Sequence, residues 1–116
     1  TFGRHPLCCA TGLASLEVIV REGLAAAAII KEQLFRKELA AMPFRVIRGE
    51  GLLLAVVPEK PEIIPDMIAR APEFGLLLDY FLFCPTAFRI APPLTISEDE
   101  IRLACSRLKI LTEAVL

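Results

Sequence analysis

Thr86-Ala87-Phe88-Arg89-Ile90-Ala91-Pro92-Pro93-Leu94 places one arginine inside an otherwise apolar stretch that predicts a β-strand ended by two prolines. Between residues 75 and 96, Asp79 and Arg89 are the side chains expected to carry charge at neutral pH. Most of this segment is suited to a protein interior, so the position of the Arg89 guanidinium has to be explained.

Strand geometry puts Phe88 and Ile90 on one face and Arg89 on the other. Arginine is rarely fully buried, so Arg89 taken alone is best interpreted as a solvent-facing residue. The functional alternative is a planar fork that binds a carboxylate through two hydrogen bonds, which arginine does better than lysine. The spacing of the residues does not choose between the two.

The chain has 116 residues, enough for one domain with one core. Hydrophobic residues make up 55% and charged residues 23%, which exceeds the usual apolar share. We therefore expect part of the surface to be covered by something outside this chain, and we interpret the chain as a piece of a larger protein.

A formal net charge of -1 with scattered basic residues argues against nucleic acid as a partner. The uncharged apolar runs at 23–30 and 51–57 are far shorter than the ~20 residues of a membrane helix. No secretory signal is visible in this chain. The four cysteines lack disulfide or CxxC spacing, which favours buried free thiols in a cytoplasmic protein.

Two helices are predicted first. Pro6 suits a first helical turn, and residues 7–19 carry one charge and apolar side chains on every side, which indicates a helix buried nearly all round. After a break at Gly23, residues 24–41 predict a helix with one side in water. Its expected buried stripe is Ala27, Ile30, Leu34 and Ala41, with Lys31, Glu32, Lys37 and Glu38 mostly away from it.

Two hairpins and a short helix follow. Residues 44–48 and 52–57 predict strands joined by a turn at Gly49-Glu50-Gly51, the second strand being central and buried on both faces. Residues 61–72 predict a short helix with Pro65 in its first turn. Residues 75–83 and 86–91 predict a second hairpin that turns at Cys84-Pro85.

Ser97-Glu98-Asp99-Glu100 has the pattern of a capping box, which predicts the start of a last helix. Its apolar face is Ile101, Ala104, Cys105, Leu108 and Leu111. Helices and hairpins in this order predict an α/β (α+β) fold of two layers, with a small mixed or antiparallel sheet and helices on one side.

Three further patterns in the sequence have residue types that occur in metal, nucleophile or anion sites. His5 with Cys8-Cys9 lacks a fourth metal ligand, and adjacent helical cysteines point about 100° apart, so packing thiols are favoured over a metal or a nucleophile. Gly49-Glu50-Gly51 is too short for a phosphate loop. Thr1, ahead of a helix start, suits either an anion site or an ordinary cap or loop residue.

Four segments in order carry a family resemblance. The chain resembles the C-terminal part of class III, ornithine/acetylornithine-type aminotransferases, which are pyridoxal 5'-phosphate enzymes of fold type I. The matching segments are Thr1-Phe2-Gly3-Arg4-His5-Pro6-Leu7, Leu16-Glu17-Val18-Ile19, Ile47-Arg48-Gly49-Glu50-Gly51-Leu52-Leu53-Leu54, and Phe88-Arg89-Ile90-Ala91-Pro92-Pro93-Leu94-Thr95-Ile96-Ser97-Glu98-Asp99-Glu100-Ile101.

The resemblance implies roles for two residues. Thr1 would donate its hydroxyl to the cofactor phosphate bound in the partner subunit, and Arg89 would bind the substrate α-carboxylate. Arg4 and His5 stand where the family usually has glycine and asparagine. The family's cofactor lysine and pyridinium-binding acid lie upstream of the matched threonine, so this chain alone is expected to be inactive.

The implied organisation is a loop and buried connecting helix at 1–22, followed by the small C-terminal domain at 23–116. The implied reaction is ping-pong transfer of an amino group from ornithine, acetylornithine or a similar amino acid to 2-oxoglutarate, in a cytoplasmic homodimer. The alternative is a free-standing α/β interaction or small-ligand-sensing module with Arg89 at its surface. An upstream lysine-bearing loop in the gene would discriminate between the two.

Overall fold

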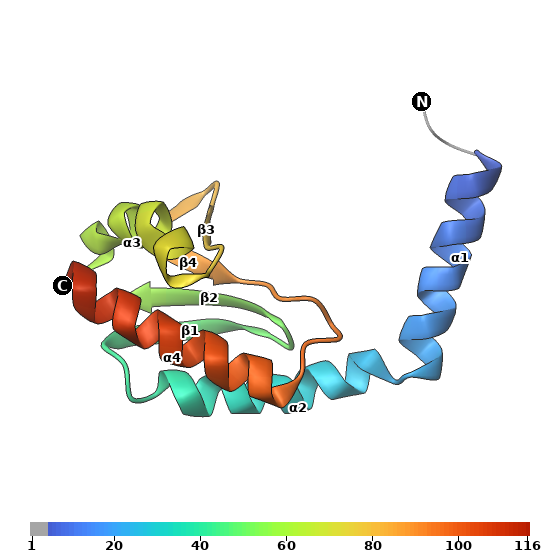
Figure 1. The fold of residues 1–116 in the computed structure, drawn as a ribbon, viewed down its shortest axis with the longest axis horizontal. Coiled ribbons are helices and arrows are strands. Elements are labelled where there is room, and N and C mark those ends of the chain that lie inside the picture. The colour runs from blue at the N-terminus through green and yellow to red at the C-terminus, as the bar shows by residue number, and fades with distance from the viewer. Residues whose placement is uncertain (1–4) are drawn as a thin grey trace.

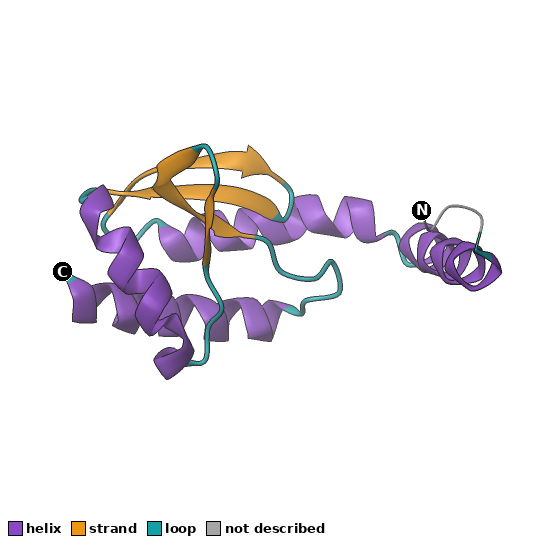
Figure 2. Cartoon of the chain, turned by 90° about the horizontal axis from the view of Figure 1, so that it is seen from above, coloured by secondary structure: helices purple, strands orange, loops and turns teal. Residues whose placement is uncertain are grey.

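A four-stranded antiparallel sheet with helices on one face forms the body of the computed structural model, which describes residues 5–116 (Figures 1 and 2). The strand order is β1-β2-β4-β3. Figure 2 shows the strands in one layer and helices α2, α3 and α4 in the other. The predicted two-layer α/β architecture is confirmed, and its sheet is antiparallel throughout.

Helix α1 (Pro6–Arg21) stands apart from this body (Figure 1). The helix itself was predicted, but the prediction that it is buried nearly all round is wrong within this chain. Leu7, Leu13, Leu16 and Val20 are 57–73% exposed, and α1 has no buried residue. A helix that is apolar on every side is suited to burial. The pattern does not show whether the elements that bury it belong to residues 5–116.

Helix α2 (Leu24–Leu39) begins after Gly23, whose backbone is left-handed with φ 61°. The predicted break is confirmed. The predicted buried stripe is wrong at two of its four positions, while Ala27 is half-buried and Leu34 packs against the core. Ile30 and Ala41 are exposed, and the polar Glu32 is buried. The apolar residues that α2 does bury are Leu24, Ala28, Phe35 and Leu39. Residues 25–28 are all alanine, so the sequence does not show which side of this part of the helix is the apolar one.

Strands β1 (Phe44–Glu50) and β2 (Leu53–Pro58) form the predicted antiparallel hairpin. The turn falls at Gly51-Leu52, so Gly49 and Glu50 belong to β1. Gly49 has φ 117°, and a Cβ there would lie 2.1 Å from the Leu53 carbonyl oxygen, which only glycine avoids. β2 is central, as predicted, but Leu53 on its outer face is exposed.

A short helical segment connects the two hairpins, as predicted. It consists of the 3-10 turn η1 (Pro61–Ile63), helix α3 (Ile64–Arg70) with a proline in its first turn, and the 3-10 turn η2 (Ala71–Phe74). Strands β3 (Asp79–Phe81) and β4 (Cys84–Ile90) form the second hairpin. Its turn is Leu82-Phe83, so the predicted turn at Cys84-Pro85 is wrong. Pro85 is tolerated because it lies at the start of its strand.

Helix α4 (Glu98–Val115) closes the core from the helix side. The predicted capping box is confirmed: Ser97 Oγ accepts from the Glu100 amide at 3.2 Å, and Glu100 Oε2 accepts from the Ser97 amide at 2.8 Å. Hydrogen bonds from Ser97 lower the pKa of Glu100. The predicted apolar face holds as well, with Ala104 only half-buried.

The prediction of buried cysteines is correct for Cys105 alone. Burial raises the pKa of Cys105 to about 12, with a smaller contribution from Glu38. Cys84 is half-buried, and Cys8 and Cys9 are exposed on α1. They are exposed because α1 has no covering neighbour among residues 5–116.

Candidate functional site

A row of four side chains crosses the face of the sheet opposite the helices. Arg48 on β1 pairs with Ala55 on β2, Ala55 pairs with Arg89 on β4, and Arg89 pairs with Asp79 on β3. Directly paired residues of an antiparallel sheet point to the same face. The residues on either side of Arg89 in β4 are buried in the core, so this row, the outer row, faces away from the helices.

Arg89 is held by an ion pair within the outer row. Its Nη2 donates to Oδ2 of Asp79, and its guanidinium carbon lies 6.0 Å from the centre of the Phe81 ring. The Arg89 and Asp79 side chains are 39% and 57% exposed. Among residues 5–116, Nε and Nη1 of Arg89 have no protein acceptor. The guanidinium therefore keeps donors for a further carboxylate.

Asp79 is the site residue that sequence reasoning missed. Its charge was noted, but its pairing with Arg89 was not. Oδ1 of Asp79 also accepts from the Tyr80 amide at 2.9 Å, which fixes the carboxylate independently of Arg89. The one signal in the sequence was the predicted hairpin, which brings a carboxylate and a guanidinium onto neighbouring strands.

A hollow lies beside the outer row, where the tip of the β3–β4 hairpin approaches the open face of the sheet. Its lining combines one guanidinium with apolar and thiol-bearing side chains: Arg48, Ala55, Phe81, Leu82, Phe83 and Cys84. Such a surface suits a small molecule that has an anionic head and an apolar body.

The end of the β1–β2 hairpin is fixed from the helix side by Glu32 and Arg36 of α2. Glu32 accepts from Arg36 Nε at 2.8 Å and from the Gly51 amide at 2.6 Å. Arg36 also donates to the carbonyls of Ile47 and Gly49, each at 3.0 Å. The hydrogen bond from Arg36, followed by that from Gly51, lowers the pKa of Glu32. These contacts hold the strand that carries Arg48.

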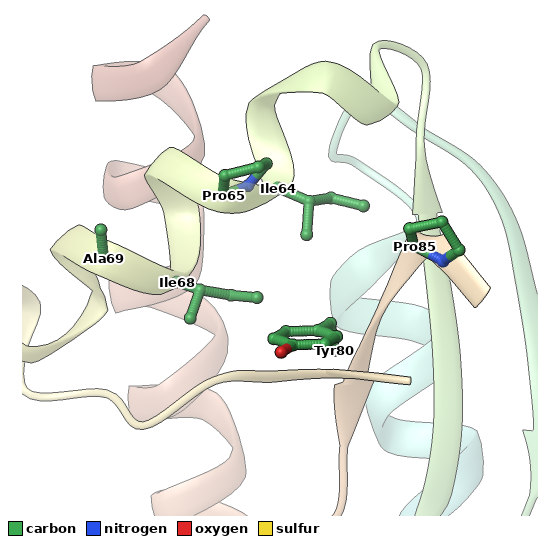
Figure 3. A pocket seen from close by; sticks show the side chains of 6 residues that line it. All are labelled: Ile64, Pro65, Ile68, Ala69, Tyr80 and Pro85. Atoms are coloured by element: carbon green, nitrogen blue, oxygen red, sulfur yellow. The ribbon is translucent and has the colours of Figure 1, made fainter. Parts of the chain in front are cut away.

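A second hollow, of about 420 Å³, lies between α3 and the β3–β4 hairpin. Figure 3 shows the Tyr80 ring below Ile64, with Ile68 to the left of the ring and Pro85 above it to the right. The six residues that line this hollow carry no charge, and the Tyr80 hydroxyl is their one polar side-chain group. The lining therefore offers no positive charge to bind a phosphate or a carboxylate.

His5 precedes α1, and Cys8 and Cys9 are exposed in its first turn. Within residues 5–116, no group of three or more histidine, cysteine, aspartate or glutamate side chains could hold a metal ion. In the same part of the chain, no helix is long and apolar enough to cross a membrane.

Nearly the whole chain matches one known protein family. The family model described as "Aminotransferase class-III" matches residues 1–111. The chain belongs to the class III aminotransferases. The match extends from before α1 to residue 111 in α4, so it covers the outer row and the whole sheet.

Curated class III relatives include ornithine and acetylornithine aminotransferases. Ornithine aminotransferase of Bacillus subtilis (strain 168) is 38% identical over 112 residues, which are 94% of this chain and 27% of the relative. Acetylornithine aminotransferase of the same organism is 36% identical over 114 residues, which are 94% of this chain and 28% of the relative. The chain thus spans about a quarter of the length of the curated relatives it matches.

Solved class III structures have the same fold. The acetylornithine aminotransferase from Elizabethkingia anophelis matches with a TM-score of 0.82 and 27% identity, over 94% of this chain and 29% of that chain. An (S)-enantioselective omega-transaminase from Thermomicrobium roseum matches with a TM-score of 0.83 and 26% identity, over 100% of this chain and 29% of that chain.

Class III membership implies pyridoxal phosphate in the full-length enzyme. The described residues do not fit this cofactor. Lys31 donates to the Leu94 carbonyl at 2.7 Å, and the other lysines, Lys37, Lys60 and Lys109, are exposed. None of the four lines either hollow described above. No step of the cofactor's chemistry is therefore assigned to residues 5–116.

Thr1, expected to bind the cofactor phosphate, lies outside the described residues, as does Arg4. His5, the other departure from the family pattern, is the exposed residue that precedes α1. The structure therefore describes one of the two predicted site residues, Arg89.

Proposed function

We propose that this chain is the C-terminal part of a pyridoxal-phosphate-dependent aminotransferase. The full-length enzyme transfers an amino group from ornithine, acetylornithine or a similar amino acid to 2-oxoglutarate. The observation that carries this proposal is the class III match over residues 1–111, and the names of the curated relatives support the choice of donor. The same match favours the enzyme over a free-standing interaction or sensing module.

Within this enzyme, Arg89 binds the α-carboxylate of the substrate. The support is its position in the outer row, where it is half-exposed and keeps Nε and Nη1 free of protein acceptors among residues 5–116. A planar guanidinium matches the two oxygens of a carboxylate. Placed on a strand whose other face is buried in the core, the fork is held by a rigid element.

The organisation of the full-length enzyme extends the proposal. Residues 1–22 join the large domain to a small domain at 23–116, and the exposed apolar side chains of α1 support a covering by the rest of the enzyme. Thr1 donates to the cofactor phosphate of the partner subunit in a homodimer. The lysine that carries the cofactor belongs to the large domain, so residues 1–116 alone have no activity. Four free thiols support a cytoplasmic location.

The test uses the full-length enzyme with Arg89→Ala and Arg89→Lys. Losing a charge-assisted carboxylate contact costs about 2–5 kcal/mol, which is roughly 30- to 5000-fold in kcat/KM. The alanine variant should show this loss for both amino-acid and 2-oxo-acid substrates, with partial activity in the lysine variant. The matched control is Arg102→Ala, which removes an exposed arginine of α4. An Arg89→Ala enzyme as active as the Arg102→Ala enzyme would remove Arg89 from the site.

A further inference from the structure

We infer that the tip of the β3–β4 hairpin docks onto the part of the full-length enzyme that precedes residue 1. The docking surface consists of the two-residue turn Leu82-Phe83 and the outer face of the sheet beside it. The inference rests on the proposed function, because it treats residues 1–116 as the C-terminal part of a longer enzyme. It adds a contact on the sheet side of the fold to the covering proposed for α1.

The turn consists of residue types that a hairpin tip in water rarely has. Leu82 and Phe83 fill the two turn positions between β3 and β4, where glycine, asparagine and aspartate are favoured. The two side chains are 78% and 93% exposed, so they contribute little to the core of residues 5–116. A large aromatic side chain is instead a typical anchor of a protein–protein interface. The tip is therefore suited to a contact outside this chain.

The sheet face next to the tip continues the apolar surface. Both turn residues line one hollow together with Arg48 and Ala55, so the tip lies beside the outer row. Val46 and Leu53 point to the same face as that row, because they lie two residues from Arg48 and Ala55 in their strands. Their side chains are 42% and 55% exposed. Apolar and aromatic side chains interspersed with arginine are typical of protein interfaces, so the docking surface has the composition of one.

The upstream part of the enzyme is the occupant that the comparisons support. The chain spans about a quarter of the curated relatives, so about three quarters of their length lies outside it. Helices α2, α3 and α4 lie on the other face of the sheet, and Figure 2 shows no helix of residues 5–116 on the outer face. Because the upstream part is covalently joined to residue 1, its contact with the tip is intramolecular and has a high effective concentration. A separate protein would have to compete with that contact.

The experiment replaces Phe83 of the full-length holoenzyme by p-benzoylphenylalanine, a photoreactive residue of similar shape. Illumination attaches its benzophenone group to C–H bonds that lie against it, and mass spectrometry of the digested enzyme identifies the attached peptides. We expect peptides that precede residue 1. The matched control carries the same photoreactive residue in place of Ile110, which is 55% exposed on α4 at the helix side of the fold. The control should give a much smaller yield of upstream peptides.

Phe83→Asn gives a second measurement, whose sign separates a docked tip from a free one. In a free tip, asparagine replaces an exposed apolar residue by one that turns favour, so the thermal midpoint should stay the same or rise. In a docked tip, an aromatic anchor is lost, and the thermal midpoint of the full-length enzyme should fall by about 4 °C. Phe83→Leu keeps an apolar side chain and should lower the midpoint less.

Two results overturn the docking. One is a label at position 83 that gives no more upstream peptides than the label at position 110, including a label that attaches to residues 1–116 alone. The other is a Phe83→Asn enzyme whose midpoint does not fall. These failures differ from failure of the proposed function. If the enzyme transfers amino groups and loses activity with Arg89→Ala, the docking alone is wrong. If the natural chain has no upstream part, the proposed function fails and the docking with it.

Discussion

Replacement of Phe88 by alanine tests the assignment of the outer row to the open face of the sheet. Phe88 is fully buried and precedes Arg89 in β4. Its ring meets the Phe44 ring edge-on, with 5.6 Å between centroids and 67° between planes. A shift of β4 by one residue would exchange the two faces, so that Arg89 would point into the core. The stability cost of Phe88→Ala therefore reports which face Arg89 occupies.

The expected cost follows from the loss of a buried ring. Replacement of a buried phenylalanine by alanine typically costs about 3–5 kcal/mol, including the cavity left behind. With a urea dependence of about 1.5 kcal/mol per molar, the unfolding midpoint should fall by about 2–3 M. Phe88→Leu fills part of the cavity and should cost about 1–2 kcal/mol, which keeps the test informative if the alanine variant does not fold.

The assay is urea unfolding of the 116-residue chain, followed by far-ultraviolet circular dichroism. Phe83 supplies the matched control, because it is a phenylalanine of the same hairpin that is 93% exposed. Phe83→Ala should change the free energy of unfolding by no more than about 0.5 kcal/mol. Equal midpoints for the two alanine variants would show that Phe88 is not in the core, and the direction assigned to Arg89 would be refuted.

Three further outcomes follow from local contacts. Ser97→Ala removes the cap of α4 and should lower the free energy of unfolding by about 0.5–2 kcal/mol, measured by urea unfolding. The pKa of Glu32 is lowered in the folded chain, so its contribution to stability is present above its unfolded pKa and is lost as pH falls through the folded pKa. Glu32→Gln should therefore lower the free energy of unfolding at pH 7, measured by urea unfolding. In strong acid the variant and the wild type should have similar stabilities. Cys105, with a pKa raised to about 12, should resist a thiol reagent at pH 8 until the chain unfolds, whereas the exposed Cys8 should react in the folded chain.

Sequence reasoning worked where a few neighbouring residues decide the structure. The capping box at Ser97 depends on positions three residues apart, and the break at Gly23 depends on one backbone angle. The buried face of α2 depends on tertiary contacts instead. Glu32 is buried because it receives hydrogen bonds from Arg36 and from the Gly51 amide, which is distant in sequence. No periodic pattern contains that information.

The pairing of Asp79 with Arg89 could not be predicted for a related reason. The β3–β4 hairpin turns at Leu82-Phe83, yet its register shifts between Tyr80 and Phe81. In a regular hairpin, paired residues lie at equal distances from the turn, so the position of the turn predicts every pair. An irregularity in one strand breaks this rule for all pairs beyond it. The sequence identified the strand, the hairpin and the two charges. The contact between the two charged side chains depends on the shift in register, and no residue type in the hairpin predicts that shift.

Contacts with β2 and with helix α2 explain the two glycines in the segment Arg48-Gly49-Glu50-Gly51. Gly49 is required because a side chain would collide with the Leu53 carbonyl, and the Gly51 amide is bound by Glu32 of α2. Arg48 precedes both glycines and pairs with Ala55 of β2, which lies between Arg48 and Arg89 in the outer row. The glycines therefore act through folding, by fixing the strand, while the arginines supply the positive charges of the outer row. A substitution of either glycine should disturb Arg48 first and Arg89 only through β2.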